Sequence, residues 1–182
     1  VVHHAIIRVT APEIMRRNYH YNCGSIPGAG QTRAVDAMKK WLGGKKPPKY
    51  ALALDIAKFY DTCPHETVMA ALRRMFKDRR FLVLHEKVLA SMGDGLAIGF
   101  HPSHWYANAV LAPIDRAIKQ TILPGCKMAR YMDDIIVLHS NKRKLHRARL
   151  LIVSCLRQMG LALKSNWQVF PVKARGVAFL SY

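Results

Sequence analysis

Residues 128–140, MARYMDDIIVLHS, place two adjacent aspartates between two apolar runs. Both runs have the composition of β-strands, and aspartate is common in tight turns. This stretch therefore predicts a strand, a turn at Asp133 and Asp134, and a second strand. Upstream, residues 52–61, LALDIAKFYD, put Asp55 at the end of another apolar strand. Because a buried carboxylate without a partner costs several kcal/mol, positive charge must meet these three aspartates.

A divalent cation is one source of that charge. If the strands are neighbours in a sheet, their ends bring Asp55, Asp133 and Asp134 to one point. Mg²⁺ prefers oxygen ligands and is typically bound by one or two carboxylates together with substrate phosphates. The alternative is that Asp133 and Asp134 only form the hairpin turn. The aspartate pair alone leaves both interpretations open.

Composition favours a nucleic acid as the partner. The 182 residues contain 29 Lys and Arg against 11 Asp and Glu, a formal net charge of +18, with the basic residues spread along the chain. Such an excess indicates binding to a polyanion, whereas the alternative, a solvated basic surface, is typical of a much smaller net charge. The apolar fraction of 51% fits one globular domain with a sizeable core.

Neither a membrane protein nor a fold stabilised by zinc or disulfides is expected. No apolar run approaches the roughly 20 residues of a spanning helix, and residues 1–17 lack the features of a secretory leader. The four cysteines are far apart and form no C-x-x-C pair, so neither a zinc site nor a disulfide framework is expected. These features favour a soluble nucleic-acid binder in a reducing cytoplasm, with no membrane partner.

The first half of the chain predicts two helices separated by a strand in residues 50–56, YALALDI, which ends near Asp55. Apolar residues at helical spacing predict one helix over residues 31–42, with Val35, Met38 and Leu42 on its buried face. A second amphipathic helix is expected shortly after the strand, within HETVMAALRRMF.

The second half predicts a long helix, the strand pair and a basic amphipathic helix. The long helix is expected within residues 103–122, with Ser103 as its N-cap and Pro113 in its middle. The amphipathic helix is expected after the strand pair and ends before Gly160. Residues 161–182 predict two or three short strands. Together these elements predict an α+β domain with an antiparallel sheet.

The motifs resemble those of reverse transcriptases. YMDD followed by an apolar strand, with DIAKFYD upstream, resembles the two catalytic motifs of that family. Residues 95–108, GLAIGFHPSHWYAN, resemble its G-L-P-x-G-x-x-x-S-x-x-x-A-N segment, with Ala97 in place of Pro. Residues 24–35, GSIPGAGQTRAV, are similar to the fingers motif G-x-x-P-G-R-G, and residues 176–182, GVAFLSY, to the F-L-G-Y primer-grip motif. The motifs follow the family's order, and their wording resembles bacterial enzymes of prophages, diversity-generating elements, retrons and group II introns more than retroviral ones.

This resemblance implies a polymerase right-hand palm, an antiparallel sheet flanked by helices, with part of the fingers and without the thumb. Residues 1–49 would form the fingers-like segment. Residues 50–182 would form the palm, with connecting helices at about residues 66–94 and a primer-grip-like strand at its end. A family member would continue beyond Tyr182 into a helical thumb, which a longer chain or a partner would supply.

The implied activity is RNA-directed DNA polymerisation, in which deoxynucleotides are added to a primer 3′ end by two-metal nucleotidyl transfer. Asp55, Asp133 and Asp134 would be the catalytic residues. With the backbone carbonyl of Ile56, they would also bind two Mg²⁺ ions, for which Mn²⁺ is an alternative. The implied partners are an RNA template, a DNA or RNA primer, deoxynucleoside triphosphates (dNTPs), and an accessory protein or separate thumb. The implied location is the bacterial cytoplasm, in association with RNA or in a ribonucleoprotein.

The resemblance also implies contacts to the deoxynucleotide and the primer-template duplex. Tyr60 would lie under the incoming sugar and exclude a ribose 2′-hydroxyl, unless it is only a core aromatic. Ala29 replaces the arginine that would clasp the triphosphate, which leaves Arg33 as a candidate for that charge. Trp167 occupies the position of a lysine that protonates pyrophosphate, so Lys164 is either the displaced general acid or a surface charge. The remaining implied contacts are Gly99, Ser103, Asn108, Tyr131 and Met132.

Two alternatives to a templated polymerase stay open. One is an RNA-binding or assembly module with a polymerase fold and little activity, which Ala29 and the displaced lysine favour. The other is a template-independent or protein-primed polymerase of the kind that bacterial defence reverse transcriptases resemble. Three clustered acids oppose the first alternative, because they would repel the phosphates of an RNA that is only bound.

Overall fold

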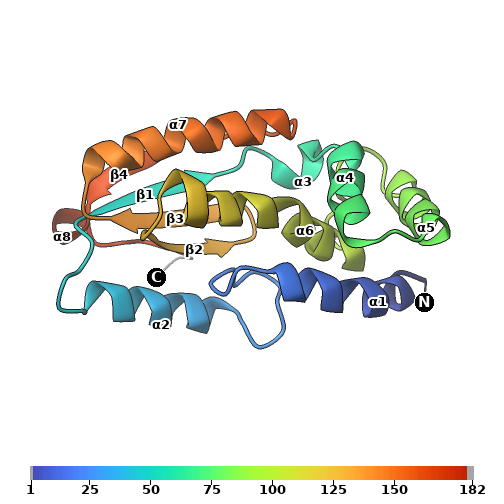
Figure 1. Cartoon of the computed structure of the whole chain (residues 1–182), viewed down its shortest axis with the longest axis horizontal. Coiled ribbons are helices and arrows are strands. Elements are labelled where there is room, and N and C mark those ends of the chain that lie inside the picture. The colour runs from blue at the N-terminus through green and yellow to red at the C-terminus, as the bar shows by residue number, and fades with distance from the viewer. Residues whose placement is uncertain (1, 180–182) are drawn as a thin grey trace.

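The computed structural model describes residues 2–179, in which a four-stranded antiparallel sheet has helices on both faces (Figure 1). The strands, in the spatial order β2-β3-β1-β4, are β1 (Tyr50–Asp55), β2 (Lys127–Tyr131), β3 (Asp134–His139) and β4 (Gln168–Pro171). The longer helices are α1 (Val2–Arg17), α2 (Gln31–Leu42), α4 (His65–Met75), α5 (Arg79–Ala90), α6 (His101–Ala117) and α7 (Lys142–Gln158). The shorter ones are α3 (Phe59–Thr62), the π-helical turn η1 (Ile118–Ile122) and α8 (Val172–Arg175).

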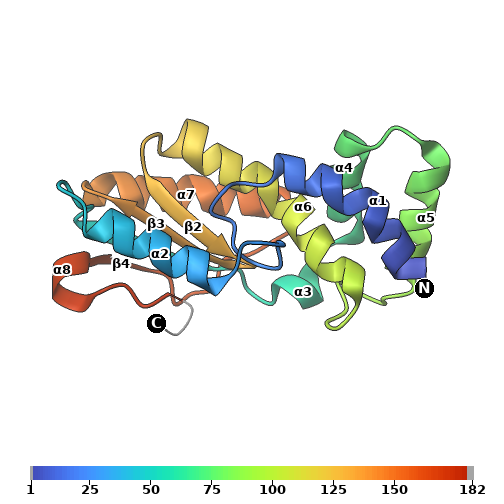
Figure 2. The ribbon, with the colours of Figure 1, turned by 90° about the horizontal axis from the view of Figure 1, so that it is seen from below.

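Both faces of the sheet are covered, which explains the continuous apolar run of β3. α7 lies along one face and contacts β1 and β3, whereas α2 packs against β2 on the other face (Figures 1 and 2). Ile135 and Val137 of β3 belong to the core that includes α7. Ile136 and Leu138, which alternate with them, belong to the core that includes α2. A strand buried on both faces needs apolar residues at every position.

Helix α6 connects the sheet to a lobe of helices. It contacts α1 and α4, and α4 contacts α5; Figure 2 shows α1 beside α6 with α4 and α5 at the same end of the molecule. Tyr106, Val110, Leu111 and Ile114 of α6 are all buried because helices pack on it from several sides.

The structure confirms the predicted α+β architecture with an antiparallel sheet. The strand that ends at Asp55 and the strand–turn–strand unit form as predicted. The helices expected over residues 31–42, after the first strand and before Gly160 also form. No helix in the described part of the chain is long and apolar enough to cross a lipid bilayer.

The predicted buried face of α2 is partly wrong. Met38 is buried as expected, but Val35 and Leu42 are only half-buried. The helix instead turns Ala34, Ala37 and Trp41 toward the sheet. Small alanine side chains let α2 lie close to β2, whose own side chains fill that face.

Ser103 is not the N-cap of α6, contrary to the sequence prediction. The helix begins at His101, and Pro102 occupies its first turn, where the missing N–H of proline costs nothing. Ser103 is therefore inside the helix and buried, and its hydroxyl donates to the Ala97 carbonyl at 2.7 Å.

Two or three strands are predicted for residues 161–182. Within the described part of that segment, residues 161–179, the structure forms one strand, β4, followed by the short helix α8. Pro171 ends the strand because proline has no N–H to donate to a ladder, and Gly176, with φ of 74°, ends α8. Residues 176–178 have no strand pairing, so the primer-grip-like strand does not form there, and residues 180–182 of that motif lie outside the described residues.

Candidate active site

The ends of β1 and β3 bring the three aspartates together. Asp55, the last residue of β1, is the direct cross-strand partner of Asp134, the first residue of β3. Asp133 precedes Asp134 in the turn after β2. Burial raises the pKa of both Asp133 and Asp134, and the negative charge of Asp55 raises each further. The structure therefore places Asp55, Asp133 and Asp134 at the same edge of the sheet, and their catalytic role stays a prediction.

Lys164 is the positive charge that meets Asp55. Its Nζ lies 2.5 Å from Asp55 Oδ2, and its backbone N–H donates to the Asp55 carbonyl at 2.8 Å. The strand-like segment that carries Lys164 is held beside the end of β1 by a further bond from Ala57 N–H to the Ala162 carbonyl. One lysine balances one of three carboxylates, so the cluster keeps a negative excess.

The donors fit a hard divalent cation. Asp55 Oδ1 is buried and has no hydrogen-bond partner, which is costly unless a further positive group approaches it. All the side-chain donors are carboxylate oxygens, which Mg²⁺ prefers, and one or two of them suffice when substrate phosphates complete the ligand set.

The predicted set of three carboxylate ligands is not preformed. Within residues 2–179, no three His, Cys, Asp or Glu side chains converge closely enough to hold a metal ion. Ile56, the predicted carbonyl ligand, is buried and bridges to Leu163. The flanking hydrogen bonds of that bridge use the carbonyls of Asp55 and Ala162, so they do not consume the Ile56 carbonyl.

The turn that carries the aspartates rests on a glycine far away in the sequence. Met132 has a left-handed backbone, with φ of 55°, and is buried. Gly24 lies directly beneath it, and a Cβ at Gly24 would lie 2.4 Å from the Met132 backbone nitrogen. Only glycine allows this contact. Tyr131 and Met132 therefore lie directly before the two aspartates of the turn, and their contact with the primer end stays a prediction.

A buried polar network lies under the same turn. The Arg130 guanidinium is fully buried and binds both carboxylate oxygens of Asp115, with Nη2 2.7 Å from Asp115 Oδ2. Its Nη1 donates to the Met132 carbonyl at 2.8 Å. Arg130 also donates to Asn108 Oδ1 at 3.3 Å. Arg130 thus links the turn to α6.

Asn108 extends this network to the segment before α2. Its Oδ1 accepts from Asn22 at 2.7 Å and its Nδ2 donates to the Gly24 carbonyl at 3.0 Å. Asn108 is fully buried, so the structure places this predicted substrate contact beneath the turn.

Sequence reasoning missed Arg130 and Asp115, although a signal was present. Arg130 stands inside an apolar strand, and Asp115 follows Ile114 on the buried part of α6. A cation and an anion at core-facing positions indicate a buried ion pair.

Tyr60 lies beside the cluster. Burial raises its pKa, and the negative charge of Asp133 raises it further. Its hydroxyl oxygen is 3.0 Å from His104 Nδ1. Gly95 approaches from the other side, and a Cβ there would lie 2.3 Å from the Tyr60 carbonyl. Gly95 has φ of 72°, so glycine is required on both counts.

Three other predicted substrate contacts, Gly99, Arg33 and Ser103, lie away from the carboxylates or are bonded elsewhere, and their roles stay predictions. Gly99 is exposed, and nothing lies within 4 Å of where its Cβ would be. The Arg33 guanidinium donates to the Gly28 carbonyl at 2.8 Å, in a separate pocket on α2. The hydroxyl of Ser103 is committed to the Ala97 carbonyl, so its role here is to hold the loop before α6.

Comparison with known proteins supports the fold. A family model described as "Reverse transcriptase (RNA-dependent DNA polymerase)" matches residues 7–182. No curated protein matches the chain by sequence. Among solved structures, the chain is similar to an apo telomerase from Candida Tropicalis truncated from its C-terminal domain, with a TM-score of 0.73 and 12% identity over 96% of this chain and 41% of that one. It is also similar to a telomerase from Candida albicans in complex with a fragment of telomeric RNA, with a TM-score of 0.68 and 12% identity over 91% of this chain and 34% of that one.

At such identities the telomerase likeness shows the fold alone. The chain spans about a third to two fifths of the length of those telomerase chains. Together with the family match, the likeness confirms the expected palm with part of the fingers. The bacterial retroelement subtype and the boundary at residue 49 stay predictions.

Proposed function

Because the chain belongs to the reverse transcriptase (RNA-dependent DNA polymerase) family, we propose that it copies RNA into DNA by adding dNTPs to a primer 3′ end. The observation that carries this proposal is the pairing of Asp55 with Asp134 across β1 and β3, with Asp133 in the adjoining turn. Divalent ions bound there, Mg²⁺ with Mn²⁺ as the alternative, supply Lewis-acid chemistry by stabilising charge on the attacking and leaving oxygens.

In this proposal the chain's own residues hold the reactants and move one proton. The buried Oδ1 of Asp55, the carboxylates of Asp133 and Asp134, and the Ile56 carbonyl are the ligands offered to the ions. The transfer breaks the O–H bond of the primer 3′-hydroxyl, whose proton passes to water. It forms the bond between the 3′-oxygen and the α-phosphorus and breaks the bond between that phosphorus and pyrophosphate. Lys164, whose ammonium group lies against Asp55, donates a proton to the departing pyrophosphate.

The remaining site residues position the nucleotide and the primer. The Tyr60 ring, near Asp133, lies under the incoming sugar. Tyr131 and Met132 lie at the primer end, and Asn108 holds their turn from below. Arg33 offers its charge to phosphates, and Gly99 and Ser103 shape the loop before α6.

The finer assignment is a bacterial retroelement enzyme that works in the cytoplasm in association with RNA. Its partners would be an RNA template, a DNA or RNA primer, dNTPs, and a thumb or accessory protein that grips the duplex. The net charge of +18 supports the nucleic-acid partners.

One observation favours the second candidate, an RNA-binding module with little activity. Lys164 already occupies Asp55 Oδ2, and no three-carboxylate metal site is preformed in the described residues. In that case the lysine would act as a permanent counter-ion instead of as an acid.

Primer extension on an RNA template with Mg²⁺ and dNTPs tests the proposal. The wild type is compared with Asp133→Asn and with Glu86→Gln, which neutralises an exposed acid on α5. We expect template-directed extension by the wild type and Glu86→Gln, and none by Asp133→Asn, because its amide cannot replace the carboxylate as a ligand.

The same assay separates the candidates. RNA binding without extension by the wild type, in this chain and in any longer natural form, would contradict the polymerase and support the binding module. Extension that ignores the template sequence would support the template-independent polymerase.

A further inference from the structure

Away from the carboxylates, the structure has a pocket of about 410 Å³ lined by lysines and aromatic rings. Its lysines are Lys40, Lys45, Lys46, Lys119 and Lys127, and its aromatic residues are Tyr19, Tyr21 and Trp41. We call it the lysine–tyrosine pocket. Lys127 is the first residue of β2, whereas the aspartate turn follows the other end of that strand. In Figure 1 the end of α2 and the start of β2 lie at the left end of the strands, and the turn between β2 and β3 lies at their right end.

The charge in this pocket has no internal counter-ion. No carboxylate lines it, and none of its five lysines forms an ion pair with an acidic side chain in the described part of the protein. Lys40, Lys45, Lys46 and Lys127 are exposed, while the Lys119 ammonium group donates to the Cys126 carbonyl. Gathered cations repel one another, and a bound polyanion removes that cost.

Aromatic rings stand among the lysines. Tyr21 is half-exposed and packs edge-on against Trp41, with ring centroids 4.7 Å apart, and near Tyr19, at 6.0 Å. Lys119 Nζ lies 5.8 Å from the centroid of the Tyr19 ring. Proteins bind single-stranded nucleic acids through two features, aromatic rings that stack on bases and cations that contact phosphates. This pocket has both.

The pocket also continues along α2. A neighbouring pocket on α2 shares Tyr21 and Lys40 with it and is also lined by Arg33 and by one acid, Asp36. Basic side chains therefore continue from the lysine–tyrosine pocket along α2, with Asp36 beside them. A path suits an extended strand better than a small anion.

We propose that the lysine–tyrosine pocket is an RNA-contact site separate from the carboxylate cluster. It takes the phosphodiester backbone of a single-stranded segment on its lysines and one base against Tyr21. The choice of RNA rests on the proposed function; the choice of a nucleic acid over an acidic protein rests on the aromatic rings.

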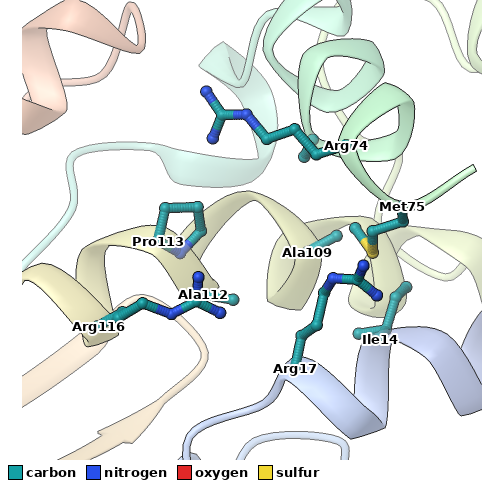
Figure 3. A pocket seen from close by; sticks show the side chains of 9 residues that line it. Ile14, Arg17, Arg74, Met75, Ala109, Ala112, Pro113 and Arg116 are labelled. Carbon is teal, nitrogen blue, oxygen red and sulfur yellow. The ribbon is translucent and has the colours of Figure 1, made fainter.

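A second basic pocket provides a matched control. It has a volume of about 130 Å³ and lies between α1, α4 and α6, where Arg17, Arg74 and Arg116 surround an apolar floor (Figure 3). Arg17 is paired with Glu13, and no aromatic ring lines this pocket. It is lined by three basic side chains, of which Arg17 is paired, and it offers no stacking surface.

The test is the affinity for a short fluorescent oligouridylate, measured by anisotropy with EDTA and without dNTPs. Lys45→Glu with Lys46→Glu is compared with Arg74→Glu with Arg116→Glu, which makes the same change of net charge at exposed positions. We expect the lysine variant to weaken binding by about tenfold and to lower the slope of log Kd against log salt by about 0.7 per lysine. The arginine variant should change both values much less. Equal losses in the two variants would overturn the proposal, because they would show a general charge effect.

Stacking is tested with Tyr21→Leu, which keeps an apolar side chain against Trp41. We expect about a fivefold weakening for oligouridylate, at the low end of a base–aromatic stack, and no weakening for an abasic oligonucleotide. Equal affinity of the wild type for both oligonucleotides, or competition by polyglutamate as strong as that by RNA, would overturn the nucleic-acid assignment. The assay needs no catalysis, so an inactive chain can still support the pocket, and an active chain whose lysine variant binds normally contradicts the pocket alone.

Discussion

At the residue scale, the charge that meets Asp55 comes from Lys164. Sequence reasoning left Lys164 as either a displaced acid or a surface charge, and the structure sets its Nζ 2.5 Å from the carboxylate. The sequence also leaves two interpretations open for Tyr60, either a core aromatic or a sugar contact. In the structure the ring is half-buried, and burial and the charge of Asp133 raise its pKa.

Replacement of Tyr60 tests that second assignment. With Tyr60→Ala, ribonucleotides should be used at least tenfold better relative to deoxynucleotides, because a single steric contact typically discriminates by about 10- to 200-fold. Tyr60→Phe should keep the discrimination, since it retains the ring and loses only the contact with His104. The measurement is the ratio of kcat/KM for the two nucleotides, and an unchanged ratio in Tyr60→Ala would assign the ring to packing.

At the element scale, a buried histidine joins three helices. His85 of α5 is fully buried, with Nδ1 2.8 Å from the Tyr106 hydroxyl of α6 and Nε2 3.3 Å from Thr10 Oγ1 of α1. Thr10 donates its proton to the Ile6 carbonyl, so Nε2–H donates to Thr10 and Nδ1 accepts from Tyr106. Both ring nitrogens are satisfied in the neutral form.

This arrangement predicts a loss of stability in acid. Burial lowers the pKa of His85 from 6.5 to about 4. Between these values the unfolded chain binds a proton that the folded chain does not, so the free energy of unfolding falls as the pH falls from 6.5 toward 4. The loss should reach about 3 kcal/mol.

His85→Gln isolates this contribution, because an amide can donate and accept without titrating. Urea unfolding of the variant at several pH values should show about 3 kcal/mol less acid loss than the wild type. Parallel pH curves for the two proteins would contradict the assignment.

At the scale of the whole molecule, one buried network ties the helical segments to the site. Arg130 of β2 binds Asp115 of α6 and the carbonyl of Met132, while Asn108 connects both to Asn22 and Gly24. The aspartate turn is thus held by groups from distant parts of the chain. The position of the carboxylates depends on the assembled fold.

Asp115→Ala should destabilise the protein by about 3–5 kcal/mol, because it leaves the Arg130 charge buried and unpaired. The double variant Asp115→Leu with Arg130→Met removes both charges. Its loss of unfolding free energy should be clearly less than the summed losses of Asp115→Leu alone and Arg130→Met alone. Urea unfolding measures each free energy. Additive losses would show that the two residues do not act as a pair.

Elements with a regular apolar pattern were predicted from the sequence, and elements that depend on single prolines or on neighbouring helices were not. The periodicity of the apolar residues predicted β1, β2, β3, α2, α4 and α7, because local burial patterns repeat within each element. It made no prediction for α1, whose sequence carries a proline and little contrast between its faces. It expected residues 118–122 to continue the long helix, where the structure forms the π-helical turn η1. It was wrong about Ser103, where Pro102 sets the first turn of α6, and it expected more strand than residues 161–179 form, where Pro171 ends β4.

The sequence by itself determined the α+β class, the strand–turn–strand unit, the three aspartates and the family resemblance, because all of these are written in short stretches of chain. Only the tertiary structure decided that Lys164 is the counter-charge of Asp55, which is 109 residues away in the sequence. It also decided that Arg130 and Asp115 support the turn. The same holds for the pocket that lysines and tyrosines from four segments line. Coulomb energy and packing depend on distance in space, and the chain brings such groups together only when it folds.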